Sequence, residues 1–163
     1  MKNFKKIVLT IMLGVLVLLP SAVYAKTEVK TNEELKAATK NGGDIVLQND
    51  IVLTDDITVK GQNISIDLNG NTITLKAYID VFEGSLEFKG NGLIKDDRED
   101  TNATIYVYGS ADSKAVAFAT LTVGKDVKIE TKRYGITVWP CEVNKKAVPT
   151  YGTVVNFNGT IIS

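Results

Sequence analysis

The residues most able to do chemistry include an acidic stretch in the middle of the chain. Residues 96–102 read D-D-R-E-D-T-N and contain four carboxylates, Asp96, Asp97, Glu99 and Asp100. Carboxylate oxygens are hard ligands that Ca²⁺ prefers, so these four are the candidate metal ligands, with Ca²⁺ as the candidate cofactor. The stretch lacks the spacing of an EF-hand loop, and a solvated charged loop is the competing interpretation. In that interpretation Arg98 pairs with Asp97 or Asp100.

Three aromatic residues are the candidate ligand-binding residues. Tyr106 and Tyr108 alternate with Ile105 and Val107, which predicts that the tyrosines lie on the outward face of a strand. Trp139 is the single tryptophan of the chain. Aromatic rings stack on the apolar faces of sugars, so a polysaccharide or a cell-surface glycan is the candidate partner. Tyrosine is also a favourable residue in any β-strand, and that is the alternative explanation.

Other site chemistries are excluded by composition. The sequence has no histidine, which removes the commonest general base and the commonest transition-metal ligand. Cys141 is the only cysteine, so the chain forms no intrachain disulfide and has no Cys–His nucleophile. The glycines do not have the G-x-G-x-x-G spacing of a phosphate-binding loop.

The first 25 residues are predicted to be a secretory signal peptide. Three lysines among the first six residues precede an apolar run over residues 7–19, and residues 23–25 fit a small-residue cleavage site. A membrane anchor is the weaker interpretation, because this run is too short to cross a bilayer of roughly 30 Å as a helix. No later segment is predicted to span a membrane. We therefore expect a secreted or extracellular protein, and association with the cell wall is a further possibility.

The charge of the remaining chain argues against nucleic acid as a partner. Removing residues 1–25 removes three lysines and no acidic residue, which leaves 16 basic and 19 acidic residues. A nucleic-acid-binding domain normally carries a basic face instead. The length fits one domain with its own core.

Residues 26–43 are predicted to be an extended, mobile linker followed by a capping helix. Thr31 and Glu34 have the spacing of a capping box, and Gly42 can end the helix in a left-handed conformation. Leu35 and Ala38 give a narrow apolar stripe. Such a short helix needs a surface to dock on, and we expect it to cover the open end of the strands that follow.

Residues 44–163 predict an all-β domain. In Ile64–Leu75, apolar and polar residues alternate on both sides of an Asn-Gly-Asn corner, and similar units recur later. Aligning Leu68, Phe88, Val123 and Phe157 gives an irregular repeat, which predicts a parallel β-helix, a solenoid. An antiparallel sandwich of short strands is the rival fold.

The segments E-E-L-K-A-A, N-G-G-D-I-V-L and I-S-I-D-L-N-G-N-T-I-T-L resemble bacterial surface proteins with pectate-lyase-like right-handed β-helices. The resemblance covers roughly residues 31–163. It implies a structural or adhesive, non-catalytic module within a longer chain. Because this sequence stops at Ser163 directly after a strand, the resemblance also implies a truncated domain, downstream modules or a capping partner.

The alternative that the same resemblance implies is a polysaccharide lyase. Lyases on this fold use an arginine or lysine to take the proton beside a uronate carboxylate. Arg133, directly before the predicted strand 134–138, is the weak catalytic candidate. The preferred prediction is a secreted or cell-surface β-helix module that binds glycans or surfaces without catalysis.

Overall fold

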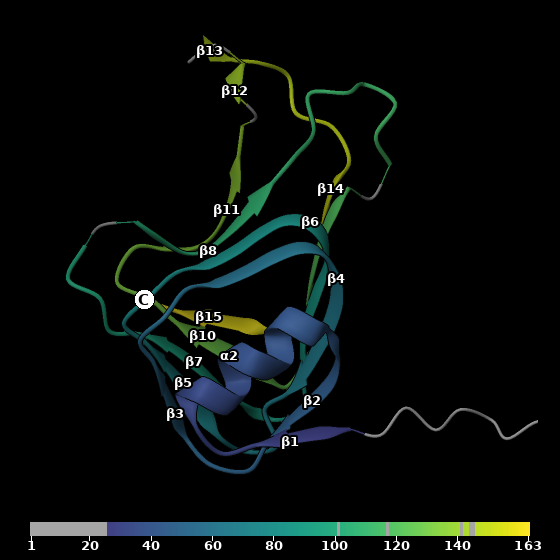
Figure 1. Cartoon of the computed structure of the whole chain (residues 1–163). Helices are drawn as coiled ribbons and strands as arrows, with labels where there is room; N and C mark the ends of the chain where they lie inside the picture. The colour runs from purple at the N-terminus through teal and green to yellow at the C-terminus, as the bar shows by residue number, and fades with distance from the viewer. Residues whose placement is uncertain (1–25, 101, 117, 141, 144–145) are drawn as a thin grey trace, which may run out of the picture.

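The computed structural model describes residues 26–163 apart from 101, 117, 141, 144 and 145, so the predicted signal peptide lies outside the described residues. One helix and a series of short and long strands make up these ranges (Figure 1). In chain order they are β1 (Thr27–Val29), α2 (Asn32–Asn41), β2 (Gly43–Leu47), β3 (Ile51–Leu53), β4 (Ile57–Asp67), β5 (Thr72–Leu75), β6 (Ile79–Lys89), β7 (Gly92–Asp96), β8 (Ala103–Tyr108), β9 (Ala119–Val123), β10 (Val127–Glu130), β11 (Tyr134–Trp139), β12 (Glu142–Val143), β13 (Lys146–Ala147), β14 (Thr153–Phe157) and β15 (Thr160–Ile162).

The strands form two large sheets in which every pairing is parallel. The first sheet has the order β1-β2-β4-β6-β8-β11, with β9 also on β6 and β14 on β9, and the second has the order β15-β10-β7-β5-β3. Figure 1 shows the strands as arcs lying one behind another. The prediction of an all-β chain with parallel strands is confirmed, and the antiparallel sandwich is excluded. The short β12–β13 pair is antiparallel and lies outside both sheets.

The parallel register stacks apolar side chains in rows. One row runs through Ile45, Ile66, Phe88, Val123 and Phe157, each in register with the next. The first four are at most 1% exposed, whereas Phe157, on the last strand of the row, is 37% exposed. Fully burying such a side chain stabilises the fold by roughly 1.5–3 kcal/mol before entropy is counted.

The predicted alignment of Leu68 with Phe88 is wrong by two residues. Ile66 is the partner of Phe88, and Leu68 lies one step further, at the corner. The alignment fails because the glycines occupy different places in the two corners: Gly70 is three residues after Asp67, whereas Gly90 directly follows Lys89, the register partner of Asp67. Leu68 is nevertheless buried, and it fills the space where a side chain at Gly92 would lie, since a Cβ there would be 2.4 Å from the Leu68 Cβ.

Positive backbone φ angles occur at a corner between two strands and at bends within two long strands. At the predicted Asn-Gly-Asn corner, Asn69 has φ 49° and Gly70 has φ 83°, which glycine and asparagine adopt at low cost. The Asn69 side chain also donates to the Leu47 carbonyl at 3.0 Å. The bends lie within long strands, because β4 continues through Gly61 (φ 88°) and β6 continues through Gly84 (φ 88°).

The helix α2 lies across one end of the sheets, as predicted (Figure 1). The Thr31 Oγ1 accepts from the Glu34 N–H at 3.2 Å, and Leu35 and Ala38 are buried. Glu34 Oε2 accepts from the Lys30 N–H rather than from Thr31. Residues 27–29, expected to be a mobile linker, instead form β1, which pairs with β2 and buries Val29.

Candidate functional site

Five aromatic side chains gather on the outward face of the first sheet, and we call them the aromatic cluster: Tyr78, Phe82, Tyr106, Tyr108 and Trp139. Tyr78 directly precedes β6, and the other four come from β6, from β8 and from the end of β11. Alternation places their neighbours inward, since Ile79, Val81, Ile105 and Val107 are fully buried. The register pairs Asp80 with Tyr106 and Tyr108 with Trp139, so outward residues of successive strands lie beside one another.

The rings of the aromatic cluster contact one another in different orientations. Phe82 and Tyr108 stack with centroids 4.0 Å apart and an interplanar angle of 16°. Tyr106 and Trp139 meet edge to face at 5.6 Å and 78°. Tyr106 is 6.2 Å from Tyr108 and 6.5 Å from Tyr78. The structure thus brings the three predicted residues together, and Trp139 stays 42% exposed.

Three adjoining hollows open on the aromatic cluster, and Trp139 lines all of them. The largest, of about 560 Å³, lies between Phe82, Tyr108 and Trp139, with Lys60 and Glu83 at its border. The second, of about 290 Å³, is lined by Tyr78, Asp80, Asn102, Tyr106, Tyr108 and Trp139. The third, of about 300 Å³, extends past Tyr106 toward Tyr134. Together they form a surface of partly exposed aromatic rings with polar side chains between them, which is the usual make-up of a ligand-binding surface.

Asp80 is the carboxylate that lines the second hollow. Its Oδ1 accepts from the Tyr108 hydroxyl at 3.4 Å. Burial, followed by the nearby charge of Asp56, raises the pKa of Asp80 above its ordinary value. Burial and the adjacent Asp80 carboxylate together raise the pKa of Tyr108 to about 12. Both shifts have burial as their largest cause, so this environment disfavours the charged form of each group.

The acidic stretch contains a buried ion pair that the sequence analysis did not predict. Arg98 donates from Nε and Nη2 to the two carboxylate oxygens of Asp96 at 2.9 and 2.7 Å, and both side chains are less than a tenth exposed. Thr104 Oγ1 donates to Asp96 at 3.0 Å, and Arg98 Nη2 donates to the Ala103 carbonyl. The predicted pairing of Arg98 with Asp97 or Asp100 is wrong. Asp96, at the end of β7, faces inward toward Arg98, whereas Asp97 and Asp100 do not.

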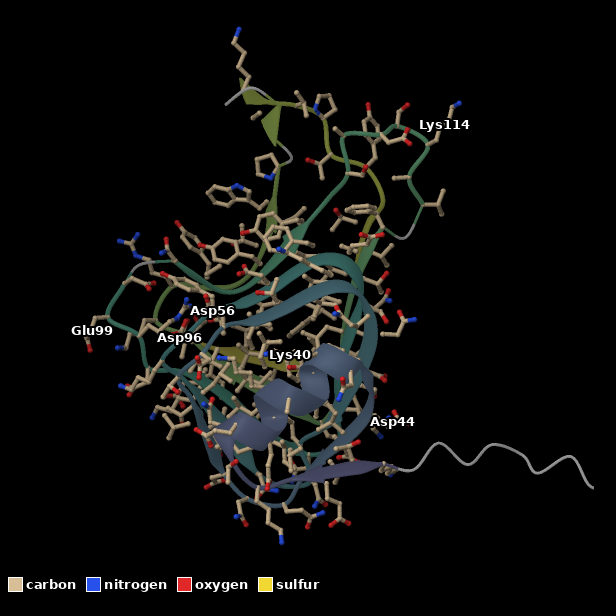
Figure 2. The ribbon with its side chains drawn as sticks, viewed as in Figure 1. Lys40, Asp44, Asp56, Asp96, Glu99 and Lys114 are labelled. Atoms are coloured by element: carbon tan, nitrogen blue, oxygen red, sulfur yellow. The ribbon has the colours of Figure 1, made fainter. Side chains whose placement is uncertain are left out.

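Each of the other predicted metal ligands has its own partner. Asp97 pairs with Lys76 at 2.5 Å, and Asp100 accepts from the Tyr78 hydroxyl at 2.7 Å. Glu99 is almost fully exposed and lies 3.8 Å from Lys132 Nζ. Figure 2 shows Glu99 pointing away from the body of the protein and Asp96 lying against it. Within the described ranges, no three acidic, cysteine or histidine side chains converge on one metal position, and the calcium site stays an untested prediction.

The catalytic candidate lies apart from the aromatic rings. Arg133 is exposed directly before β11, and its backbone N–H donates to Thr131 Oγ1 at 3.3 Å. None of the three hollows on the aromatic cluster is lined by Arg133. Its assignment as a catalytic residue remains untested. Cys141 lies outside the described residues.

Sequence reasoning missed Tyr78, Asp80 and Phe82 as members of the site. The signal was present, because these residues alternate with Ile79 and Val81 just as Tyr106 and Tyr108 alternate with their neighbours. What was missing was the register between β6 and β8, which places the two outward series side by side.

The family model named "Putative pectate lyase-like adhesive domain" matches residues 26–160. The chain belongs to this family. The match supports an adhesive or structural role and covers nearly all of the described residues. No curated protein and no solved structure gave a match to the chain. Among the described residues, no helix has both the length and the apolar character needed to cross a membrane.

Proposed function

We propose that this adhesive domain is a secreted, right-handed parallel β-helix that binds glycans through the aromatic cluster without catalysis. The fold proposal rests on two parallel sheets whose strands alternate along the chain, with inward rows in register. In such a solenoid, outward residues of successive coils form a continuous surface. The coils then act as a rigid scaffold for the binding residues.

The observation that carries the proposal is the gathering of Tyr106, Tyr108 and Trp139 at one face, with Tyr78 and Phe82 completing the surface. Exposed rings in several orientations can contact the apolar faces of adjoining sugar units, while Asn102 and Asp80 beside them can hydrogen-bond to hydroxyl groups. The three adjoining hollows fit consecutive units of a chain better than a single small molecule.

A panel of immobilised polysaccharides and cell-wall glycans tests this function. The wild-type protein is compared with Tyr106→Ala/Trp139→Ala, which removes the edge-to-face pair on the outward surface. Tyr151→Ala is the matched control, because Tyr151 is similarly exposed but lines none of the three hollows. We expect the double variant to lose binding and the control to retain it. Equal binding by all three proteins, or no binding by the wild type, would overturn the proposal.

Two other parts of the proposal have direct tests. N-terminal sequencing of the exported protein should begin at Lys26 if residues 1–25 are a signal peptide. The same glycan panel, extended to uronate polymers with Ca²⁺ and followed by absorbance of unsaturated products, tests the lyase alternative and the calcium prediction together. Product formation that Arg133→Ala abolishes would replace the non-catalytic proposal.

A further inference from the structure

The second hollow of the site has an unusual lining, and we call it the aromatic cup: Tyr78, Asp80, Asn102, Tyr106, Tyr108 and Trp139. Four of these six residues present aromatic rings. Asp80 is the only carboxylate among them. We propose that the aromatic cup binds a cationic nitrogen, an ammonium or quaternary ammonium group, and that the glycan ligand is one with free amino groups. This inference rests on the proposed function, since it concerns the same surface.

The ring geometry suits a cation. The π faces of tyrosine and tryptophan carry negative electrostatic potential, which attracts a cation lying within about 6 Å of the ring centroid. Tyr106 and Trp139 stand nearly perpendicular, with centroids 5.6 Å apart, so they form two walls of a corner. Tyr78 and Tyr108 flank Tyr106 at 6.5 and 6.2 Å. One face of Tyr78 is already covered by the Arg98 guanidinium, 4.4 Å from the ring centroid, and one face of Tyr108 is covered by Phe82. A positively charged group in the aromatic cup can therefore contact Tyr106 and Trp139 together.

Asp80 makes no ion pair among the described residues, although the charges of Arg98 and Lys60 partly offset the rise in its pKa. Arg98 is the buried cation nearby, but its charge is matched by the bidentate contact with Asp96. Lys60 lies 5.2 Å above the Phe82 ring, at the border of the neighbouring hollow. Asp56, which accepts from the Tyr78 N–H, adds a second negative charge close to Asp80.

This arrangement discriminates between classes of sugar. A uronate carboxylate entering the aromatic cup would meet the Asp80 carboxylate and be repelled. A neutral sugar would gain ring stacking but would remove Asp80 further from water without neutralising it, which is unfavourable. An amino sugar satisfies both features, because its ammonium group pairs with Asp80 and the CH groups of its sugar ring contact the aromatic rings.

The test measures binding of three probes by calorimetry at a pH where the amines are protonated. The probes are a glucosamine oligosaccharide, the N-acetylglucosamine oligosaccharide of the same length, and choline, which is a permanently charged ammonium without a sugar. Each is titrated into wild type, Asp80→Asn and Asp126→Asn. Asp126 is the control because it is an exposed aspartate beside the second sheet, remote from the aromatic cup.

We expect wild type and Asp126→Asn to bind the amino oligosaccharide about tenfold more tightly than the acetylated one, a preference that Asp80→Asn abolishes. Equal binding of the two oligosaccharides, or tighter binding of the acetylated one, would overturn the inference and leave the glycan function standing. Asp80-dependent binding of choline without either oligosaccharide would support the cationic site and overturn the glycan ligand. No binding of any probe would overturn the inference, while the wider glycan panel would still decide the proposed function.

Discussion

The buried pair between Asp96 and Arg98 gives the sharpest prediction about stability. Replacing Arg98 by methionine keeps much of the side-chain volume but leaves the Asp96 carboxylate, 7% exposed, without its cation. Breaking a buried ion pair by removing one partner costs about 3–5 kcal/mol. The substitution also removes the donor to the Ala103 carbonyl and the cation 4.4 Å above the Tyr78 ring. We therefore expect the melting temperature to fall by about 10–20 °C for a domain of this size.

The second arm of this experiment removes the charge and keeps the shape. In Asp96→Asn/Arg98→Met the amide oxygen still accepts from Thr104, so the double variant should lose only about 1–3 kcal/mol, for the unpaired Ala103 carbonyl. Lys95→Met is the control, since the Lys95–Glu130 pair is more than 40% exposed on both sides and should change stability by at most about 1 kcal/mol.

Urea unfolding followed by circular dichroism measures the free energy of each variant. The pH dependence supplies an independent check. Burial alone would raise the pKa of Asp96, but the hydrogen bonds and charge of Arg98 outweigh it and lower the pKa. The wild type should thus keep this stabilisation above the unfolded pKa of about 3.9 and lose it as the pH falls through the folded value. Arg98→Met should instead gain stability on mild acidification. A loss under about 1 kcal/mol in Arg98→Met, or a double variant less stable than the single one, would refute the reasoning.

The remaining predictions concern the backbone corners, the facing of the strands and Asp80. Gly84→Ala should destabilise the protein far more than Gly61→Ala. Both glycines have φ 88°, but a Cβ at Gly84 would lie 2.2 Å from the Gln62 carbonyl oxygen, whereas a Cβ at Gly61 would meet open space. In thermal melts Gly61→Ala should therefore show only the positive-φ strain of about 1–2 kcal/mol, and Gly84→Ala should show that strain plus a steric clash. Ile66→Asp should prevent folding because the site is fully buried, whereas Asp67→Ala should lose only about 1 kcal/mol for its bond to the Asn69 N–H; equal tolerance in urea titrations would contradict the assigned faces. Asp80→Asn should be more stable than wild type at neutral pH. Because the pKa of Asp80 is raised in the folded state, the wild type has its full stability below the unfolded-state pKa and loses part of it as the pH rises through the folded-state pKa. Identical stability of the two proteins from acidic to neutral pH would rule this out.

The alternation of apolar and polar residues was enough to predict which side chains face inward. Ile64, Ile66, Ile105 and Val107 are all buried as expected, because a period of two leaves a half-buried strand little choice of face. Register was harder to predict. Gly70 is three residues after Asp67, whereas Gly90 directly follows Lys89, the register partner of Asp67, and aligning the two glycines therefore displaced the first repeat by two residues.

The candidate site was predicted only in part for the same reason. Tyr106, Tyr108 and Trp139 could be chosen as outward aromatic residues, but Asp80 and Phe82 join them through pairing between β6 and β8, which no local pattern encodes. The Asp96–Arg98 pair was missed because charged residues in a run are usually solvated. Here Asp96 occupies an inward position at the end of β7, and Arg98 follows it into the interior.

Fluorescence of Trp139 tests the central claim most directly. It is the single tryptophan of the chain, it lines all three hollows, and it is 42% exposed, so a bound sugar that stacks on it changes its surroundings. Titration with a glucosamine oligosaccharide is predicted to give a saturable shift of the emission to shorter wavelength, weakened in Tyr106→Ala and unchanged in Tyr151→Ala. Emission that stays constant with every glycan that the protein retains on the panel would contradict the assignment of this surface as the binding site.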